Sequence, residues 1–359
     1  MDPHRSPQIH DSSAPSPGPS SLSRRNLLRL DFGPRSTPPT DWLRVHRPAM
    51  ACRFEIVLDS PAHVPAARLA LDEADRLEGA LTVFRDTSEL MRINHHAARM
   101  PVRPDDEVFE LLRRCGDMCD DTGGAFDITS TPLSRCWGFL RRDGRLPSSE
   151  ELERARSLVG MHLVRLGDTD RTVSFAREGV ELNLGSVGKG YALGRMAHLL
   201  KRDGVDEALL SAGGSSVAAV GGPDGGWIVD VKSRQISRER LARLRLSTRS
   251  DAVKRGFSPA IGLATSGAGE QFVTIDGVRY GHVIDPRTGW PAQGVLSVSV
   301  VCDDPATADA LSTAFLVGGR ALAEQYCARH PETLVLLTPD DGSERPIVIG
   351  SHRGATVTE

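Results

Sequence analysis

Asp309 and Thr313 stand four residues apart in a segment with a helical pattern. Residues four apart on a helix lie on one face, about one turn from each other. A carboxylate and a hydroxyl are hard oxygen ligands, of the kind that Mg²⁺ binds where it also contacts phosphate groups. The pair predicts a divalent-cation site, although an Asp near a helix start and a Thr inside a helix are common without any ligand.

A glycine-rich segment leads into a second helical pattern. Residues 183–191 read Asn-Leu-Gly-Ser-Val-Gly-Lys-Gly-Tyr, and the pattern continues to Leu200. Free N–H groups where a loop enters a helix can face a phosphate, and Lys189 would add positive charge there. The segment has neither GxxxxGK[ST] nor GxGxxG spacing, because position 183 is Asn and Gly190 follows the lysine. It predicts either a phosphate-facing loop or a turn that packs a helix against a sheet.

Residues 282–289, His-Val-Ile-Asp-Pro-Arg-Thr-Gly, place three functional side chains within six positions. Pro286 and Gly289 predict a rigid loop rather than a mobile tail. An imidazole titrates near neutral pH, so His282 could take a proton from an attacking hydroxyl. A solvated or hydrogen-bonding loop histidine is the alternative.

The rest of the pattern indicates the elements that hold these residues. Asp304 and Pro305 predict the start of the helix with Asp309, and Gly318-Gly319 predicts its end. Alternating residues at 54–58 predict a half-exposed strand. We expect further helices at 67–81, 105–119 and 148–158, and strands near 164 and 173 and at 208–210, 227–231, 262–265, 272–275, 295–301 and 334–337. Interleaved helices and strands without an internal repeat favour an α+β fold over a doubly wound sheet.

Composition excludes several classes of protein. Forty-four basic against forty-seven acidic residues give no global positive field, so we expect no nucleic-acid partner. Charged residues interrupt every apolar stretch within about ten positions, so no membrane span is predicted. Six cysteines lack CxxC spacing and are expected to be small buried hydrophobes rather than zinc ligands or disulfides. The sequence does not indicate an oligomeric state.

The N-terminal segment is rich in Ser, Pro, Arg and Gly, which predicts a disordered arm over residues 1–40. Within it, residues 23–28 are similar to the twin-arginine start of an export signal. Arg29 and Asp31 interrupt the apolar stretch that such a signal requires. We therefore expect a cytoplasmic protein, with export through a degenerate twin-arginine signal as the alternative.

Taken together, the motifs resemble those of one family, the FAD:protein FMN transferases, or ApbE family. The resemblance runs from about Met50 to Gly319 and keeps the order of the family's motifs. The matching segments are residues 88–94 (Ser-Glu-Leu-Met-Arg-Ile-Asn), 124–129 (Gly-Ala-Phe-Asp-Ile-Thr) with 132–133 and 137–139, 184–192, 264–267 (Ala-Thr-Ser-Gly), 282–291 and 308–314 (Ala-Asp-Ala-Leu-Ser-Thr-Ala).

The resemblance implies an α+β domain over residues 41–350, in two intimately packed lobes with mixed or antiparallel sheets and a flavin-binding cleft between them, followed by a flexible tail at 351–359. It implies Mg²⁺-dependent transfer of FMN from FAD to a Thr or Ser of an acceptor flavoprotein subunit, with release of AMP. By position it assigns the residues as follows: metal ligands Asp309, Thr313 and the Gly188 carbonyl; FAD contacts Met50, Glu89, Leu90, Met91 and Asp127; a phosphate neighbour Lys189; and a general base His282.

The chain also departs from the family's pattern. Ala51-Cys52 replaces Gly-Thr, and Asn183, Ser186, Gly188, Gly194 and Ser215 replace Asp, Gly, Ala, an acidic residue and Asp. Loss of carboxylates could weaken the metal site. Two alternatives therefore stay open: a pyrophosphatase that cleaves FAD to FMN and AMP, and a non-catalytic flavin-binding or delivery protein. No acceptor segment of the form D-G-x-[ST]-G-A-[ST] is evident in this chain, so self-modification is not expected.

Overall fold

The computed structural model describes residues 28–30, 42–140, 144–223, 225–232, 240–248, 258–269, 272–275, 277–343 and 345–358. Most of the expected N-terminal arm, including residues 23–27 of the twin-arginine segment 23–28, lies outside these residues.

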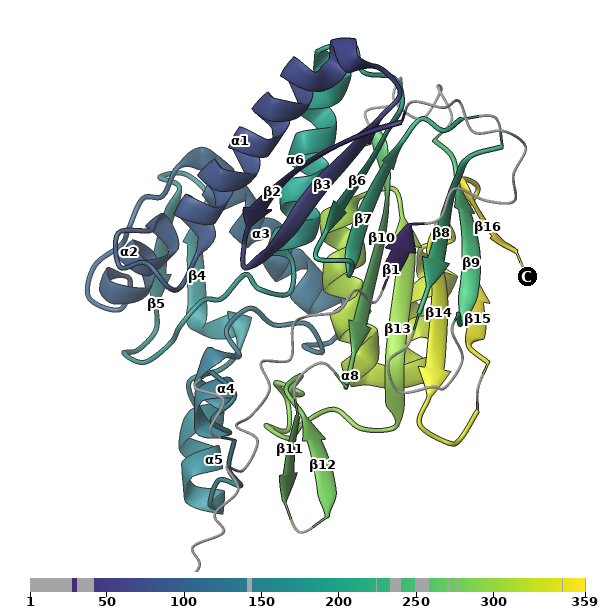
Figure 1. The fold of residues 1–359 in the computed structure, drawn as a ribbon. Helices are drawn as coiled ribbons and strands as arrows, with labels where there is room; N and C mark the ends of the chain where they lie inside the picture. The colour runs from purple at the N-terminus through teal and green to yellow at the C-terminus, as the bar shows by residue number, and fades with distance from the viewer. Residues whose placement is uncertain are drawn as a thin grey trace, which may run out of the picture.

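An eight-stranded sheet forms the centre of the molecule (Figure 1). Every pairing between its neighbours is antiparallel. From edge to edge the strands are β15 (Ile347–Gly350), β14 (Leu334–Pro339), β13 (Val295–Cys302), β10 (Ala260–Gly267), β7 (Ser216–Val220), β6 (Ala208–Ala212), β3 (Cys52–Leu58) and β2 (Leu43–Ala49). The predicted α+β class is confirmed; the division into two lobes stays a prediction.

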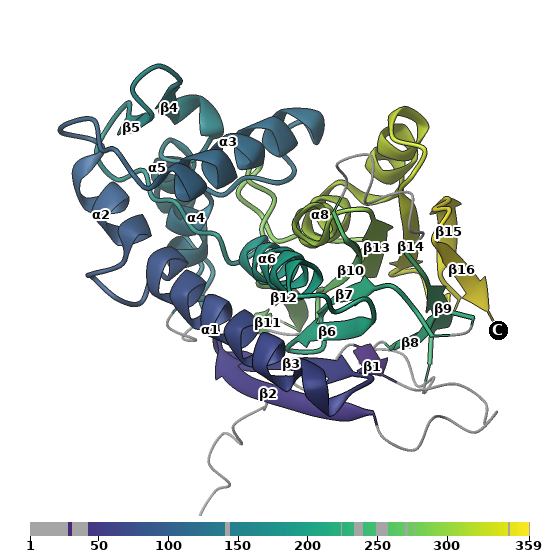
Figure 2. The same cartoon turned by 90° about the horizontal axis from the view of Figure 1, so that it is seen from above.

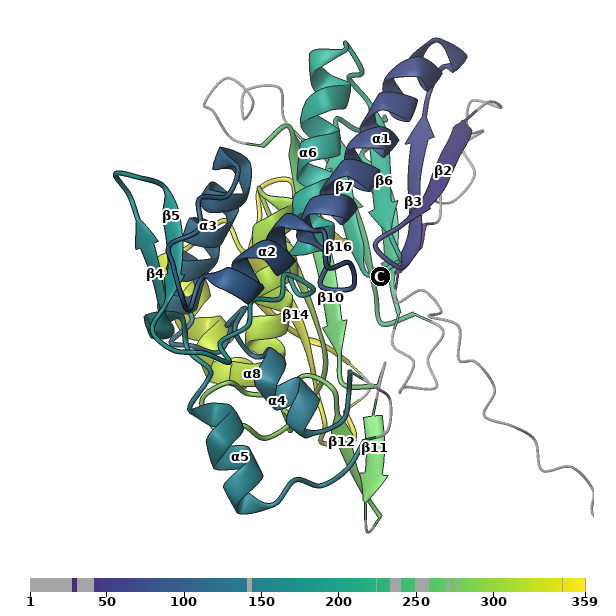
Figure 3. The same cartoon turned by 90° about the vertical axis from the view of Figure 1, so that its left-hand side faces the viewer.

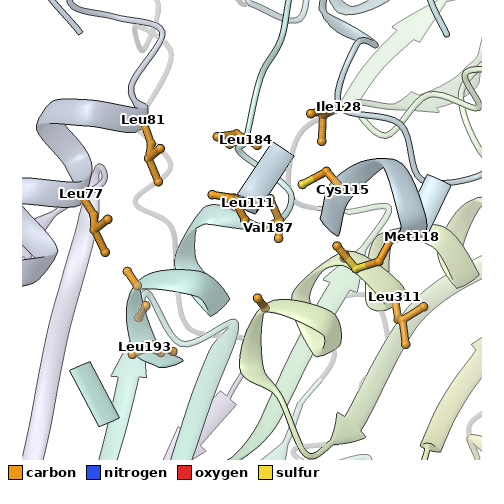
Figure 4. Packing of buried hydrophobic residues seen from close by; sticks show 14 of the residues in the cluster. Leu77, Leu81, Leu111, Cys115, Met118, Ile128, Leu184, Val187, Leu193 and Leu311 are labelled. Carbon is orange, nitrogen blue, oxygen red and sulfur yellow. The ribbon is translucent and has the colours of Figure 1, made fainter. Parts of the chain in front are cut away.

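Helices cover one face of this sheet (Figure 2). The helices packed on the strands are α1 (Val64–Leu81), α6 (Gly188–Arg202) and α8 (Pro305–Arg329), and α3 (Asp106–Asp121) packs outside them against α8. Apolar side chains from all four helices meet in the main core, among them Leu77, Leu111, Leu193 and Leu311 (Figure 4). Their helical spacing in the sequence is what gives each helix its buried face.

A second sheet covers the opposite face. Its order is β1 (Leu28–Leu30), β8 (Trp227–Val231), β9 (Ala242–Leu246) and β16 (Ala355–Thr358). Strand β3 contacts both cores, because successive side chains of a strand face opposite ways: Phe54, Ile56 and Leu58 lie in the main core and Val57 lies in the second.

Two short segments differ from expectation. Residues 355–358, within the expected flexible tail, form β16 and pair with β9. The backbone of Leu28–Leu30, within the expected arm, pairs with β8. Both segments add a strand at an edge of the second sheet. Whether such a short segment forms a strand depends on a pairing partner far away in the sequence.

The smaller elements lie around the main body, and those at residues 131–136, 149–156, 272–275 and 278–281 lie below it (Figure 3). They are two 3-10 turns, Pro61–His63 and Met161–Leu163; the helices α2 (Glu89–His96), α4 (Thr131–Cys136) and α5 (Ser149–Arg156); and the two-stranded pairs β4 (Val164–Gly167) with β5 (Thr172–Phe175) and β11 (Phe272–Ile275) with β12 (Val278–Gly281).

The predicted start of α8 is confirmed, and the helix is interrupted at the glycine pair where its end was predicted. The Asp304 carboxylate caps the helix by accepting from the Thr307 N–H at 2.8 Å, and Pro305 occupies the first turn. Gly319 has non-helical dihedrals (φ 66°, ψ −162°), but the helix resumes and continues to Arg329. The first helical segment of α8 therefore ends at the glycine pair, and a second segment follows it.

Two further expectations from composition concern the cysteines and membrane spans. All six cysteines are free, and five of them are buried. Among the described helices, none combines the length and apolar character that crossing a membrane would require.

Candidate functional site

Asp309 lies near the start of α8 and is only 4% exposed. Its Oδ2 accepts a hydrogen bond from the Gly190 N–H at 2.9 Å, and its Oδ1 accepts from the Ser216 hydroxyl at 3.0 Å. The Lys189 Nζ is 3.8 Å from Oδ1. A carboxylate offers about four lone-pair sites, so these two hydrogen bonds leave acceptor capacity on both oxygens.

The contact between Asp309 and Gly190 depends on a close approach of two helices. A Cβ added to Gly190 would lie 2.1 Å from the Pro305 carbonyl oxygen and 2.8 Å from the Asp309 Cβ. Only glycine permits this distance between α6 and α8. The glycine-rich segment thus packs α6 tightly against its neighbour α8. The same packing brings the first turn of α6 to the Asp309 carboxylate.

Lys189 and Gly188 occupy the first positions of α6, which begins at Gly188 rather than at the expected Asn183. Gly188 is buried, and its N–H donates to the Leu184 carbonyl at 2.7 Å. A Cβ at Gly188 would meet nothing within 4 Å, so glycine is not required there for space. The departure from Ala at this position leaves the backbone carbonyl in place.

Thr313 follows Asp309 by one turn of α8 and is half-buried. Its hydroxyl lies 3.2 Å from the Ser266 hydroxyl at the end of β10. The predicted pair therefore lies on a helix as expected, with Lys189 and Gly190 beside the carboxylate.

The segment before α6 is clamped by two other motifs. The Asn94 side chain on α2 accepts from the Leu182 N–H at 2.8 Å and donates to the Leu182 carbonyl at 3.0 Å. The Asn183 N–H donates to the Ile128 carbonyl at 2.8 Å, and the Asn183 Oδ1 accepts from the Gly185 N–H at 2.8 Å. These bonds tie the segments 88–94 and 124–129 to the start of α6.

Asp127 is buried, and its carboxylate is hydrogen-bonded within the protein. Oδ1 accepts from the Thr129 N–H at 2.8 Å and the Thr129 hydroxyl at 2.6 Å, and Oδ2 accepts from the Met161 N–H at 3.1 Å. Burial raises the pKa of Cys119 to about 12, so its thiol stays protonated and lies as a donor 3.7 Å from Oδ2. The structure thus gives Asp127 a role in joining three segments; its predicted contact with FAD stays a prediction.

The three residues predicted from the segment 88–94 differ in their surroundings. Glu89 accepts from the Asp105 N–H at 2.5 Å and contacts Arg92 at 3.3 Å. Leu90 is fully buried in the main core, so only its backbone could contact a ligand. Met91 is half-buried, and its sulfur lies 3.7 Å from the Asn94 Nδ2.

Met50 lies in the turn between β2 and β3 and packs against the main core. Met50 and Ala51 both have positive φ, 48° and 57°, as a tight turn between twisted strands requires. Next to this turn, a Cβ on Gly213 would lie 2.9 Å from the Cys52 Cβ. Cys52, the first residue of β3 after this turn, thus lies beside the β6–β7 turn, which leads to Ser216.

His282 follows β12 directly and is half-buried. The loop after it is held by its own backbone: the Ala292 N–H donates to the Val283 carbonyl and the Asp285 N–H to the Trp290 carbonyl, each at 2.8 Å. The Trp137 indole N–H donates to the Gly289 carbonyl at 2.8 Å. These hydrogen bonds hold the loop that the sequence predicted; the role of His282 as a general base stays a prediction.

Sequence analysis missed two serines of this site. Ser216 donates to Asp309, and Ser266 contacts Thr313. Ser266 belongs to the Ala-Thr-Ser-Gly segment noted above, so a signal existed, but the residue type alone gave it no role. Ser216 offered no comparable signal.

The donor set suits a hard divalent cation. Asp309 and Thr313 supply a carboxylate and a hydroxyl with acceptor capacity left over; the Gly188 carbonyl, which the resemblance adds as a third oxygen, stays a prediction. Within the described residues, no group of three or more His, Cys, Asp and Glu side chains could hold a metal ion. Such an ion would therefore have to complete its coordination with other oxygens.

The family and the relatives that match this chain agree with one another. The ApbE family model matches residues 50–337. The FAD:protein FMN transferase of Treponema pallidum is 32% identical over 295 residues, covering 77% of this chain and 77% of that protein, and the one of Vibrio cholerae is 27% identical, covering 85% and 90%.

Solved structures agree. The ApbE protein of Thermotoga maritima superposes with a TM-score of 0.74 at 28% identity, covering 87% of this chain and 97% of that one. The Pseudomonas stutzeri flavinyl transferase ApbE gives a TM-score of 0.72 at 25% identity, covering 87% and 95%. From the family match and these relatives we conclude that the chain belongs to the ApbE family.

Proposed function

We propose that this protein is an FAD:protein FMN transferase, which moves the FMN part of FAD to a Thr or Ser hydroxyl of an acceptor protein and releases AMP. The named activity of its relatives supports the proposal. The observation that carries it in this chain is the buried Asp309 carboxylate, held by Gly190 and Ser216 with Lys189 alongside.

The proposed site would bind the pyrophosphate of FAD beside the start of α6. Lys189 would lie next to the phosphates, and Asp309, Thr313 and the Gly188 carbonyl would hold Mg²⁺. A bound Mg²⁺ would offset the negative charge that develops on the pyrophosphate oxygens. The remaining FAD contacts, at Met50, Glu89, Leu90, Met91 and Asp127, are proposed from the family resemblance.

The transfer step would exchange one P–O bond for another. The acceptor hydroxyl oxygen attacks the phosphorus of the FMN half, the bond from that phosphorus to the bridging oxygen breaks, and AMP leaves with the bridging oxygen. His282 takes the hydroxyl proton as general base. The product is a phosphodiester between FMN and the acceptor side chain.

One experiment separates the proposal from its alternatives. The purified protein is incubated with FAD and Mg²⁺, with and without an acceptor protein that carries a D-G-x-[ST]-G-A-[ST] segment. Covalent flavin on the acceptor, together with AMP, supports the proposal. Equal release of FMN and AMP without acceptor would identify a pyrophosphatase, and intact bound FAD would identify a binding or delivery protein.

A further inference from the structure

Four oxygen atoms beside the proposed metal site form a chain of hydrogen bonds. The Thr313 and Ser266 hydroxyls are 3.2 Å apart, and the Ser266 and Ser312 hydroxyls are 2.8 Å apart. The Ser312 hydroxyl donates to the Asp309 main-chain carbonyl at 2.8 Å. The chain connects β10 to the helix turn that bears both predicted metal ligands.

The direction of every bond in this chain follows from its last member. A carbonyl oxygen can only accept, so the single proton of the Ser312 hydroxyl is committed to the Asp309 carbonyl. Ser312 must then accept from Ser266. Ser266 has no second proton, so it must accept from Thr313.

These directions fix where the proton of the Thr313 hydroxyl points. Its proton is held by Ser266, and both lone pairs of its oxygen remain acceptors. A threonine inside a helix otherwise bonds to the carbonyl three or four residues before it. Here the carbonyl four residues earlier, that of Asp309, already accepts from Ser312.

We propose that Ser266 and Ser312 are positioning residues that keep the Thr313 hydroxyl proton away from the ligand and so prepare its oxygen to bind a cation. The inference rests on the proposed function, because that function supplies the cation. Neither serine needs to touch the metal. Ser312 is fully buried, so any influence it has on a ligand must pass through Ser266.

The test measures the affinity for Mg²⁺ rather than turnover. FAD binding is followed by flavin fluorescence anisotropy, without acceptor, first in EDTA and then across a Mg²⁺ titration. Ser266→Ala is expected to raise the Mg²⁺ concentration needed for half of the response about ten-fold, as loss of a residue that orients a metal ligand typically does. Ser312→Ala should act in the same direction, and Ser266→Thr, which keeps the hydroxyl, should restore the wild-type value.

A matched control is available on the same strands. Thr265 on β10 and Ser299 on β13 form another buried hydroxyl pair, 2.8 Å apart, which is not part of the hydrogen-bond chain from Thr313 to the Asp309 carbonyl. Ser299→Ala removes a buried serine hydroxyl in the same way and should leave the Mg²⁺ response unchanged. FAD affinity in EDTA should be the same in all variants, since a general loss of structure would lower it.

Each outcome decides between the proposals. If the wild-type protein responds to Mg²⁺ and Ser266→Ala gives the same titration curve, the positioning role of the two serines is wrong and the metal assignment stands. An equal loss of FAD affinity in EDTA and in Mg²⁺ also overturns the positioning role, because the serine would then act on the fold or on FAD directly. If the wild-type protein shows no Mg²⁺ response, the metal assignment is wrong, and the positioning role of the serines is wrong with it.

Discussion

Gly190→Ala tests whether the close packing of α6 on α8 builds the site. The added methyl group would lie 2.1 Å from the Pro305 carbonyl oxygen, 2.7 Å from the Pro305 carbonyl carbon and 2.8 Å from the Asp309 Cβ. Two of these atoms are backbone, so no side-chain rotation relieves the clash. The helices would have to separate by more than about 1 Å to reach ordinary contact.

The free-energy cost has three parts. Overpacking costs about 1–3 kcal/mol. Separation of the helices also breaks the hydrogen bond from the Gly190 N–H to the Asp309 carboxylate, which contributes about 1.5–3 kcal/mol. The higher helix propensity of Ala returns about 1 kcal/mol. We expect a net destabilisation of about 1.5–5 kcal/mol, which a domain of ordinary stability, about 5–15 kcal/mol, tolerates.

Urea unfolding and the Mg²⁺-dependent binding of FAD measure the two effects. Gly194→Ala is the matched control, since Gly194 lies one turn further along α6 on the same face and its added Cβ would be 3.8 Å from the Pro305 ring. That variant should be as stable as the wild type or up to about 1 kcal/mol more stable. A Gly190→Ala protein with wild-type stability and wild-type FAD binding would refute the packing argument.

Four further outcomes are expected. Asp309→Asn keeps the shape of the side chain and removes its charge; the amide oxygen can accept from the Gly190 N–H while the NH₂ group donates to the Ser216 hydroxyl, which reverses that one bond. Calorimetry should therefore show the Mg²⁺ response lost while the free energy of unfolding changes by no more than about 1 kcal/mol. His282→Ala should leave the dissociation constant of FAD unchanged and slow transfer about 10²- to 10⁴-fold; an equal loss of both would make it a binding residue. Ala51→Gly should stabilise the protein by about 0.5–1 kcal/mol in thermal unfolding, because φ is 57° at this exposed turn and Gly tolerates that value. A hydrogen bond from His352 lowers the pKa of Asp303 below its ordinary 3.8. The ionised Asp303 therefore contributes its full stability above about pH 4 and loses it as the pH falls through its lowered pKa. The difference in the free energy of unfolding between wild type and Asp303→Asn should shrink below about pH 4.

Local signals predicted most of the fold. The helix start at Asp304 and the helical spacing of α1, α3 and α6 depend on residues within a few positions of each other. The errors lie where distant contacts decide. Residues 355–358 become a strand because β9 offers a free edge, and nothing within that short segment shows it.

Sequence spacing could pair the two candidate ligands of the site but could not predict the residues that contact them. Asp309 and Thr313 could be paired from their spacing. The partners that hold them, Ser216 and Ser266, are 93 and 47 positions away in the sequence. A serine hydroxyl gives no sign of its role until the fold places an acceptor or donor beside it, and Asn94, which clamps Leu182 from 88 positions away, follows the same rule.

The carboxylates that this chain lacks, compared with its family, bear on activity less than their number suggests. Asn183 uses its side-chain oxygen to accept from the Gly185 N–H, as an Asp would, so the turn before α6 keeps its hydrogen bond without the charge. An added Cβ at Gly194 would lie 3.9 Å from the Asp304 carboxylate, which caps α8 and pairs with Arg114. An acidic residue there would meet a like charge at the helix cap, a turn before Asp309. Neither replacement removes a hydrogen bond from Asp309, so these two altered positions are compatible with an active transferase. Mg²⁺ affinity should respond to Asp309 and its serine partners more than to Asn183→Asp or Gly194→Glu.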